Sequence, residues 1–193
     1  MQGFSLYFEL GWQHILNWQA YDHILFIVAL CGIYLLPDWK KVLILVTAFT
    51  IGHSTTLALS VLHIILLPTQ WIEFFIPVTI VITAAINISR KRTFNKRLNL
   101  TYFMALCFGL IHGLGFSNYL KSLLGNTSGI VTQLLAFNIG LEIGQIVVVL
   151  LVLFTSFLVV SVLRKQKREW HLFLSSAIFG IALVMAIERF PGF

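Results

Sequence analysis

Six ionisable side chains lie within or beside long apolar runs of this sequence, where a charged group is costly. Placing such a group at the centre of a bilayer costs roughly 2.5–3.5 kcal/mol on insertion scales, so its presence indicates a function. The six residues are His14, Asp22, His23, His53, His112 and Glu142. Imidazole nitrogen suits Zn, Cu, Fe and Ni, and a carboxylate adds negative charge that offsets a divalent cation. Together these side chains predict a transition-metal site.

The composition predicts the elements that carry these residues. Of the 193 residues, 59% are hydrophobic and 10% are charged, whereas roughly a quarter of a soluble domain is charged. Apolar runs near the length of about 20 residues that crosses a bilayer as a helix recur along the chain. We therefore expect an all-α bundle of six transmembrane helices in a single integral membrane domain, 1–193. The predicted spans are about 22–37, 42–64, 71–89, 98–118, 130–163 and 170–190.

Basic residues predict the orientation, because Lys and Arg accumulate in short cytoplasmic loops. They concentrate in 38–41, 90–97 and 164–169, and only Lys121 and Arg189 fall on the other side. With six spans, both termini are expected to be extracytoplasmic, and all six ionisable residues fall in the outer half. The formal charge of +6 then reflects topology and contact with the lipid bilayer, so we expect no nucleic-acid partner.

Residues 1–12 have neither a basic segment nor a small-residue cleavage pattern, so no signal peptide is expected. At the other terminus, we interpret Glu188 and Arg189 as a local pair outside the site.

Helical periodicity places further polar residues beside the candidate ligands. At about 100° per residue, Thr47, Thr50, His53 and Ser54 share one helix face, and a second polar face is shared by Asn138, Glu142 and Gln145. A metal-bound histidine usually donates its other ring N–H to a neighbouring group, and Ser54, Asn138 and Gln145 are the candidates for that role. Small residues would let the helices approach closely beside His112 and Glu142; they are Gly109, Gly113, Gly140 and Gly144.

The position of His14 sets a geometric condition. On a straight helix it would lie about 12 Å along the axis from Asp22, too far for both residues to bind one ion. If they cooperate, the chain must bend between Asn17 and Tyr21; otherwise His14 is a separate outer capture site.

Four segments of the sequence resemble the HupE/UreJ family of membrane proteins. They are HILNWQAYDHILF (14–26), FTIGHSTTLAL (49–59), FGLIHGLGF (108–116) and FNIGLEIGQ (137–145), and the resemblance extends over about 9–160. In this chain seven residues separate His14 from Asp22, whereas the better-studied permeases of the family have five.

The resemblance implies a function in metal transport. Members of the family accompany hydrogenase and urease systems and are regarded as nickel or cobalt permeases. The resemblance places the family's metal-binding residues on the six ionisable residues given above. It also implies an integral protein of the bacterial inner (plasma) membrane.

Residue chemistry alone leaves two other functions open. The same ligands could hold Zn in an intramembrane hydrolase with a carboxylate as general base, or they could serve a metal-binding assembly factor. The cofactor or cargo is thus Ni, Zn or Co. A homo-oligomer or a partner in metalloenzyme maturation also remains open.

Overall fold

The computed structural model describes residues 2–18, 21–65, 67–89, 98–124 and 129–192, and every regular element in these ranges is a helix. The helices in chain order are α1 (Gln2–Leu16), α2 (Asp22–Cys31), the 3-10 helix η2 (Leu36–Asp38), α3 (Trp39–Val61), α4 (Thr69–Ser89), α5 (Leu98–Gly115), α6 (Ser117–Leu124), α7 (Ile130–Phe157), the π-helix η3 (Leu158–Val162) and α8 (Lys167–Glu188). The predicted all-α class is confirmed. The predicted basic loop 90–97 lies outside the described residues.

Four helical stretches among the described residues are long and apolar enough to cross a membrane: Leu36–Val61, Thr69–Ser89, Ile130–Val162 and Lys167–Glu188. A fifth candidate is the pair α5 and α6, which meet at an angle of 47°. The described residues thus account for four or five of the six predicted transmembrane spans.

The shortfall lies in the predicted first span, 22–37. In its place α2 contains ten residues, or about 15 Å of helix, against a hydrocarbon core of about 30 Å. The helix ends at Cys31, and the following residues belong to a loop and to η2. Apolar composition continued through this loop, which is why hydropathy alone placed the end of the span too late.

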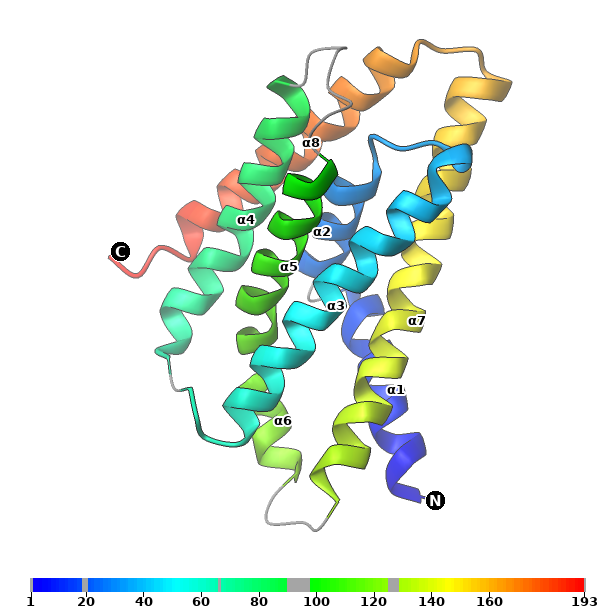
Figure 1. Cartoon of the computed structure of the whole chain (residues 1–193). Helices are drawn as coiled ribbons and strands as arrows, with labels where there is room; N and C mark the ends of the chain where they lie inside the picture. Colours follow the sequence, from blue (N-terminus) through cyan, green and yellow to red (C-terminus); the bar gives the residue numbers. More distant parts are fainter. Residues whose placement is uncertain (1, 19–20, 66, 90–97, 125–128, 193) are drawn as a thin grey trace.

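The helices pack in neighbouring pairs, α1 with α7, α3 with α5, and α4 with α8. Figure 1 shows α1 and α2 following one another along the bundle, so that α1 occupies one half of its length and α2 the other. The two basic segments 38–41 and 164–168 lie at the same end of the bundle, and α1 begins at the opposite end (Figure 1). We refer to 38–41 and 164–168 as the basic end.

Glycines allow α3 and α5 to meet backbone to backbone. A Cβ atom added at Gly109 would collide with the backbone of Phe49 and His53, and one at Gly113 would collide with the carbonyl of His53. On α3, Gly52 has the same relation to the backbone of Leu106. The predicted close approach beside His112 is therefore confirmed.

The second pair of predicted small residues, Gly140 and Gly144, lets α1 pack closely against α7. A Cβ at Gly140 would meet the backbone of Phe8 and Trp12, and one at Gly144 would press on Ile15. Gly11 of α1 faces the carbonyl of Phe137 in the same way. These contacts hold α1, which carries His14, tightly along α7.

Candidate metal centre

The break between α1 and α2 brings His14 next to His23. α1 ends at Leu16 and α2 begins at Asp22, and the centroids of the two imidazole rings lie 4.4 Å apart. Since a straight helix would separate His14 from Asp22 by about 12 Å, only a break of this kind lets the two segments cooperate. The condition set by the sequence is met.

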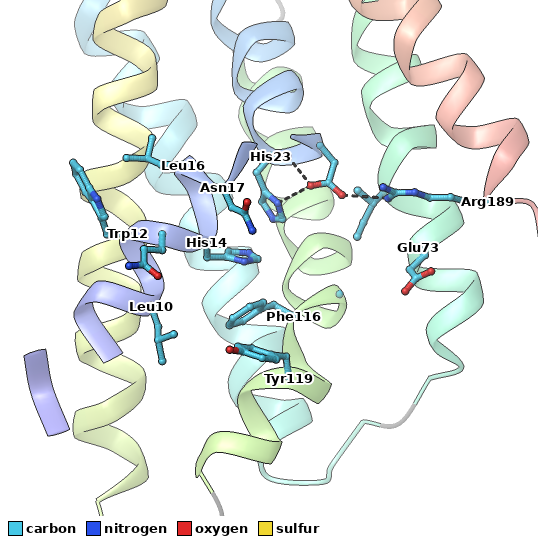
Figure 2. Close-up of a pocket in the computed structure, with 14 residues that line it drawn as sticks. Leu10, Trp12, His14, Leu16, Asn17, His23, Glu73, Phe116, Tyr119 and Arg189 are labelled. Carbon is cyan, nitrogen blue, oxygen red and sulfur yellow. Dashed lines mark hydrogen bonds and ion pairs between the residues drawn. The ribbon is translucent and has the colours of Figure 1, made fainter. Parts of the chain in front are cut away.

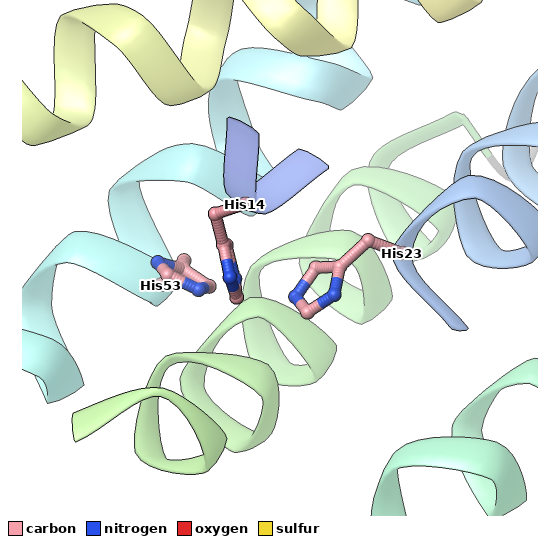
Figure 3. Close-up of side chains that lie close together, drawn as sticks. All are labelled: His14, His23 and His53. Carbon is pink, nitrogen blue, oxygen red and sulfur yellow. The ribbon is translucent and has the colours of Figure 1, made fainter. Parts of the chain in front are cut away.

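Three histidines from three helices form a cluster, which comprises His14 of α1, His23 of α2 and His53 of α3 (Figure 3). One ring nitrogen from each lies within 4.8 Å of the other two. Nitrogens bound to a single tetrahedral ion at 2.0–2.1 Å lie about 3.3 Å apart, so the rings would close by at most about 1.5 Å. Small changes in side-chain torsions can supply that movement.

Four of the six ring nitrogens in this histidine cluster are buried without a hydrogen-bond partner in the described structure. His53 is completely buried, and neither of its ring nitrogens has a hydrogen bond in the described structure. The same holds for Nε2 of His14 and Nε2 of His23. Because buried polar atoms nearly always have hydrogen-bond partners, a group of such nitrogens indicates a site for a ligand that satisfies them.

Asp22 orients His23. Its Oδ1 accepts a hydrogen bond from the backbone N–H of His23 at 2.9 Å and lies 3.1 Å from Nδ1 of the same residue. A carboxylate accepts hydrogen bonds, so Nδ1 carries the proton and Nε2 keeps its lone pair. This is the arrangement in which a carboxylate fixes the tautomer of a metal-binding histidine. Asp22, predicted as a ligand, is thus placed behind the ring of His23.

His112 lies beside the cluster, with its ring centroid 5.2 Å from that of His23. Its Nε2 is 2.9 Å from Oγ1 of Thr79, whose hydroxyl donates to the carbonyl of Ile76 at 2.7 Å. Nε2 of His112 is thus engaged with Thr79, and whether it donates or accepts in that contact depends on the tautomer of the ring. Nδ1 is buried without a hydrogen bond in the described structure. His112 therefore lies beside the cluster as a neighbouring imidazole, but the nitrogens that lie within 4.8 Å of one another are those of His14, His23 and His53.

The structure does not bring Glu142 into the histidine cluster. Its Oε1 accepts a hydrogen bond from Thr47 at 3.1 Å, and the neighbouring Gln145 accepts one from Thr50 at 2.7 Å. These two pairs join α7 to α3 along one face. Periodicity correctly identified the polar faces, but it could not tell which groups they would meet.

Of the three predicted partners of the metal-bound histidines, Gln145 has a different partner in the structure, and the roles of Asn138 and Ser54 stay predictions. Gln145 is paired with Thr50, Oδ1 of Asn138 is buried without a hydrogen bond in the described structure, and Ser54 is half-buried on α3. Hydrogen bonds to the imidazoles come instead from Asp22, at His23, and from Thr79, at His112.

A cavity of about 880 Å³ leads to the histidine cluster (Figure 2). Its lining includes Trp12, His14, His23, Glu73, Phe116 and Arg189. Glu73 lies close to the start of α4, so the cavity opens in the half of the bundle that is distant from the basic end. A hydrated ion can thus reach the imidazoles from that side.

Arg189 also lies in this cavity, which corrects its assignment to a local pair with Glu188. Its Nη1 is 3.2 Å from Oδ2 of Asp22, and Figure 2 shows the side chain reaching from the end of α8 to the start of α2. The sequence did contain a signal, since Arg189 is one of two basic residues outside the three basic loops. Thr79 gave no such signal, because a threonine in an apolar helix is common.

Comparison with known proteins gives one match. The family model described as HupE / UreJ protein matches residues 1–189, which confirms the resemblance and extends it beyond 9–160. No curated protein and no solved structure matches the chain significantly. From the family match, the chain therefore belongs to the HupE/UreJ family.

Proposed function

We propose that the protein is a divalent transition-metal permease with nickel as its cargo. The observation that carries this proposal is the convergence of His14, His23 and His53 from three helices at the end of an open cavity. Neutral imidazoles can replace part of the hydration shell of a transition-metal dication. Membership of the HupE/UreJ family supports the same function.

In the membrane, we place the basic end in the cytoplasm, as the concentration of Lys and Arg favours. α1 and α2 together contain 15 and 10 residues, enough for roughly 37 Å of helix, and would form one broken crossing. With α5 and α6 as another, this gives six crossings and two extracytoplasmic termini. The cavity then faces the outside of a bacterial inner membrane.

The proposed route toward the cytoplasm continues from His53 along the contact between α3 and α7, where Thr50 is buried and Thr47 lies at the exposed edge. Thr50 and Thr47 lie about 4.5 and 9 Å closer to the basic end along α3, given a rise of 1.5 Å per residue. They are bonded to Gln145 and Glu142 of α7. These groups supply oxygen donors that bind a transition metal less tightly than imidazole does, as release from the cluster requires.

The driving force would be the membrane potential. The sequence contains no phosphate-binding GxxxxGK[ST] loop. A potential of 100 mV, negative inside, supplies about 4.6 kcal/mol for a dication. Because about 1.4 kcal/mol corresponds to a tenfold gradient, this energy would sustain an accumulation of roughly three orders of magnitude.

The contacts of the carboxylates favour a permease over a zinc hydrolase. A hydrolase needs a general base within hydrogen-bond reach of a metal-bound water. Asp22 is already engaged with His23 and Arg189, and Glu142 is bonded to Thr47. Both carboxylates among the six candidate ligands therefore have another contact, and Glu73, which also lines the cavity, is the carboxylate that a test for hydrolysis would address.

Uptake into vesicles tests this proposal. Purified protein in liposomes with an inside-negative potential is expected to admit Ni²⁺ or Co²⁺, reported by an enclosed metal-sensitive dye. His53→Asn should reduce the rate to that of empty liposomes. If wild-type vesicles admit no Ni²⁺, Co²⁺ or Zn²⁺ with a potential or with a pH gradient of either sign, transport is ruled out and hydrolysis becomes the function to test.

The Glu142→Gln variant distinguishes a defect in metal binding from a defect in metal transport. Because Glu142 lies outside the histidine cluster, the variant is expected to bind Ni²⁺ as the wild type does. Uptake should fall by about tenfold or more, because an amide lacks the charge that offsets a dication in a low-dielectric span. Saturating external metal should not restore the rate. Glu188→Gln, at the exposed end of α8, is the matched control. A Glu142→Gln protein that has lost its metal would place this carboxylate in the binding site itself.

A further inference from the structure

His14 is the member of the histidine cluster whose ring has the fewest constraints. His23 is oriented by the contact between its Nδ1 and Asp22, and His53 is completely buried where α3 meets α5. His14 lies in the last turn of α1, is only half-buried and lines the cavity. Its Nε2 has no hydrogen bond in the described structure, so this atom does not hold the ring in place.

The ring of Phe116 packs against this imidazole. The two ring centroids lie 4.1 Å apart, with an angle of 48° between the ring planes. Figure 2 shows the imidazole of His14 between the rings of His23 and Phe116. Phe116 in turn stacks on Phe137, with centroids 5.1 Å apart and planes 15° from parallel, and Phe137 is completely buried. The imidazole therefore rests against an aromatic pair that is anchored in the core.

The bend between α5 and α6 places Phe116 at this position. Phe116 stands between Gly115, which ends α5, and Ser117, which begins α6, and the two helices meet at 47°. The carbonyl of Phe116 accepts a hydrogen bond from the backbone N–H of Leu120 at 3.1 Å. The buried hydroxyl of Ser117 donates to the carbonyl of Leu114 at 2.7 Å. These bonds fix the backbone on both sides of Phe116, so its ring has a rigid support.

An aromatic contact suits a metal-binding imidazole because it leaves the ring nitrogens free. A hydrogen-bond partner would occupy a nitrogen that the ion needs, whereas a phenyl ring restricts the imidazole through packing and a favourable ring–ring geometry. A ring that is already held in place loses less conformational freedom when the ion binds. This gain should be largest at His14, because His23 and His53 have other constraints.

We propose that Phe116 is a positioning residue that holds the imidazole of His14 in the orientation required for metal binding. It acts through His14 and supplies no ligand atom of its own. The inference rests on the proposed function in that it takes the histidine cluster as a metal site, but it does not require that the metal be transported.

A double-mutant cycle tests this role, with the full-length chain in lipid nanodiscs and Co²⁺ as the probe. Equilibrium dialysis gives the dissociation constant. Phe116→Leu keeps an apolar side chain but removes the aromatic ring, and it is expected to weaken binding by about tenfold. In a His14→Ala background the same substitution should change the constant by less than about twofold, because the ring that Phe116 positions is absent. Phe116→Tyr retains the ring and should bind Co²⁺ as the wild type does.

Phe74→Leu is the matched control. Phe74 is also half-buried, and its ring centroid lies 5.4 Å from those of Phe75 and Phe190. It belongs to an aromatic cluster of α4 and is not among the residues that line the cavity. The control should bind Co²⁺ as the wild type does. A loss as large as that in Phe116→Leu would mean that any aromatic contact in this half of the bundle affects binding, and it would overturn the specific role of Phe116.

The remaining outcomes separate this inference from the broader function. Equal constants for the wild type and Phe116→Leu overturn it, and so does a loss of the same size with and without His14. If no non-aromatic variant at position 116 folds, NMR of the metal-free wild type with labelled histidine decides. One ring orientation is then expected for His14, and several populated orientations contradict the role of Phe116. A wild-type chain that binds no Co²⁺ removes the metal site and both claims with it, whereas binding without vesicle uptake removes transport alone.

Discussion

Replacing His53 with asparagine is expected to lower the affinity for Ni²⁺, Co²⁺ or Zn²⁺ by about 100-fold or more. His53 is completely buried, and its two ring nitrogens have no hydrogen-bond partner in the described structure, so under the proposed function these nitrogens are free to bind the ion. Loss of one of three imidazole ligands removes a coordinate bond that an amide replaces poorly. Isothermal titration of the purified protein measures the change.

The matched control for this substitution is His63→Asn. His63 lies just beyond α3, is exposed and has a φ of 59°, a backbone conformation that asparagine tolerates well. The control should bind metal as the wild type does. If both variants bind equally well, His53 is not a ligand and the histidine cluster is not the site.

A methyl group at Gly109 is expected to destabilise the protein by about 1–3 kcal/mol, the usual cost of overpacking. The added Cβ would collide with backbone atoms of Phe49 and His53, and neither can move without separating α3 from α5. Because α3 carries His53 and α5 carries His112, the separation should also weaken metal binding. Denaturant unfolding in detergent, followed by circular dichroism, gives the free energy of unfolding.

Gly180→Ala is the control for Gly109→Ala. Gly180 lies within α8, and no atom lies within 4 Å of an added Cβ there. Alanine should stabilise that helix by up to about 1 kcal/mol because it favours helix over coil more than glycine does. Equal stability of the two variants would mean that the α3–α5 contact is looser than described.

Much of the site was predictable because charged groups are costly in a bilayer. This cost singled out all four histidines of the centre, and the small residues beside His112 and Glu142 predicted where backbones meet. The remaining errors concern which side chains lie next to one another in the folded chain. Glu142 shares a helix face with Gln145, as periodicity predicts, but periodicity cannot say that the face meets Thr47 and Thr50 rather than the histidine cluster.

The same limit explains two further errors, which concern the end of the predicted span 22–37 and the predicted pairing of Arg189 with Glu188. Hydropathy measures how apolar a run is, so it joined α2 to the loop that follows Cys31. It did end the predicted span 98–118 close to the end of α5 at Gly115. Arg189 and Asp22 are 167 positions apart, and no local pattern connects such distant residues. Their contact depends on how α8 packs against the rest of the bundle.

X-ray absorption spectroscopy of the Ni²⁺-loaded protein tests the central claim most directly. Imidazole rings produce a characteristic multiple-scattering pattern, and the cluster of His14, His23 and His53 predicts at least three of them around one ion. His53→Asn should remove one ring from the pattern, and His63→Asn should leave it unchanged. A shell made only of oxygen or sulfur, or a pattern unaffected by His53→Asn, would contradict the assignment of the histidine cluster as the metal centre.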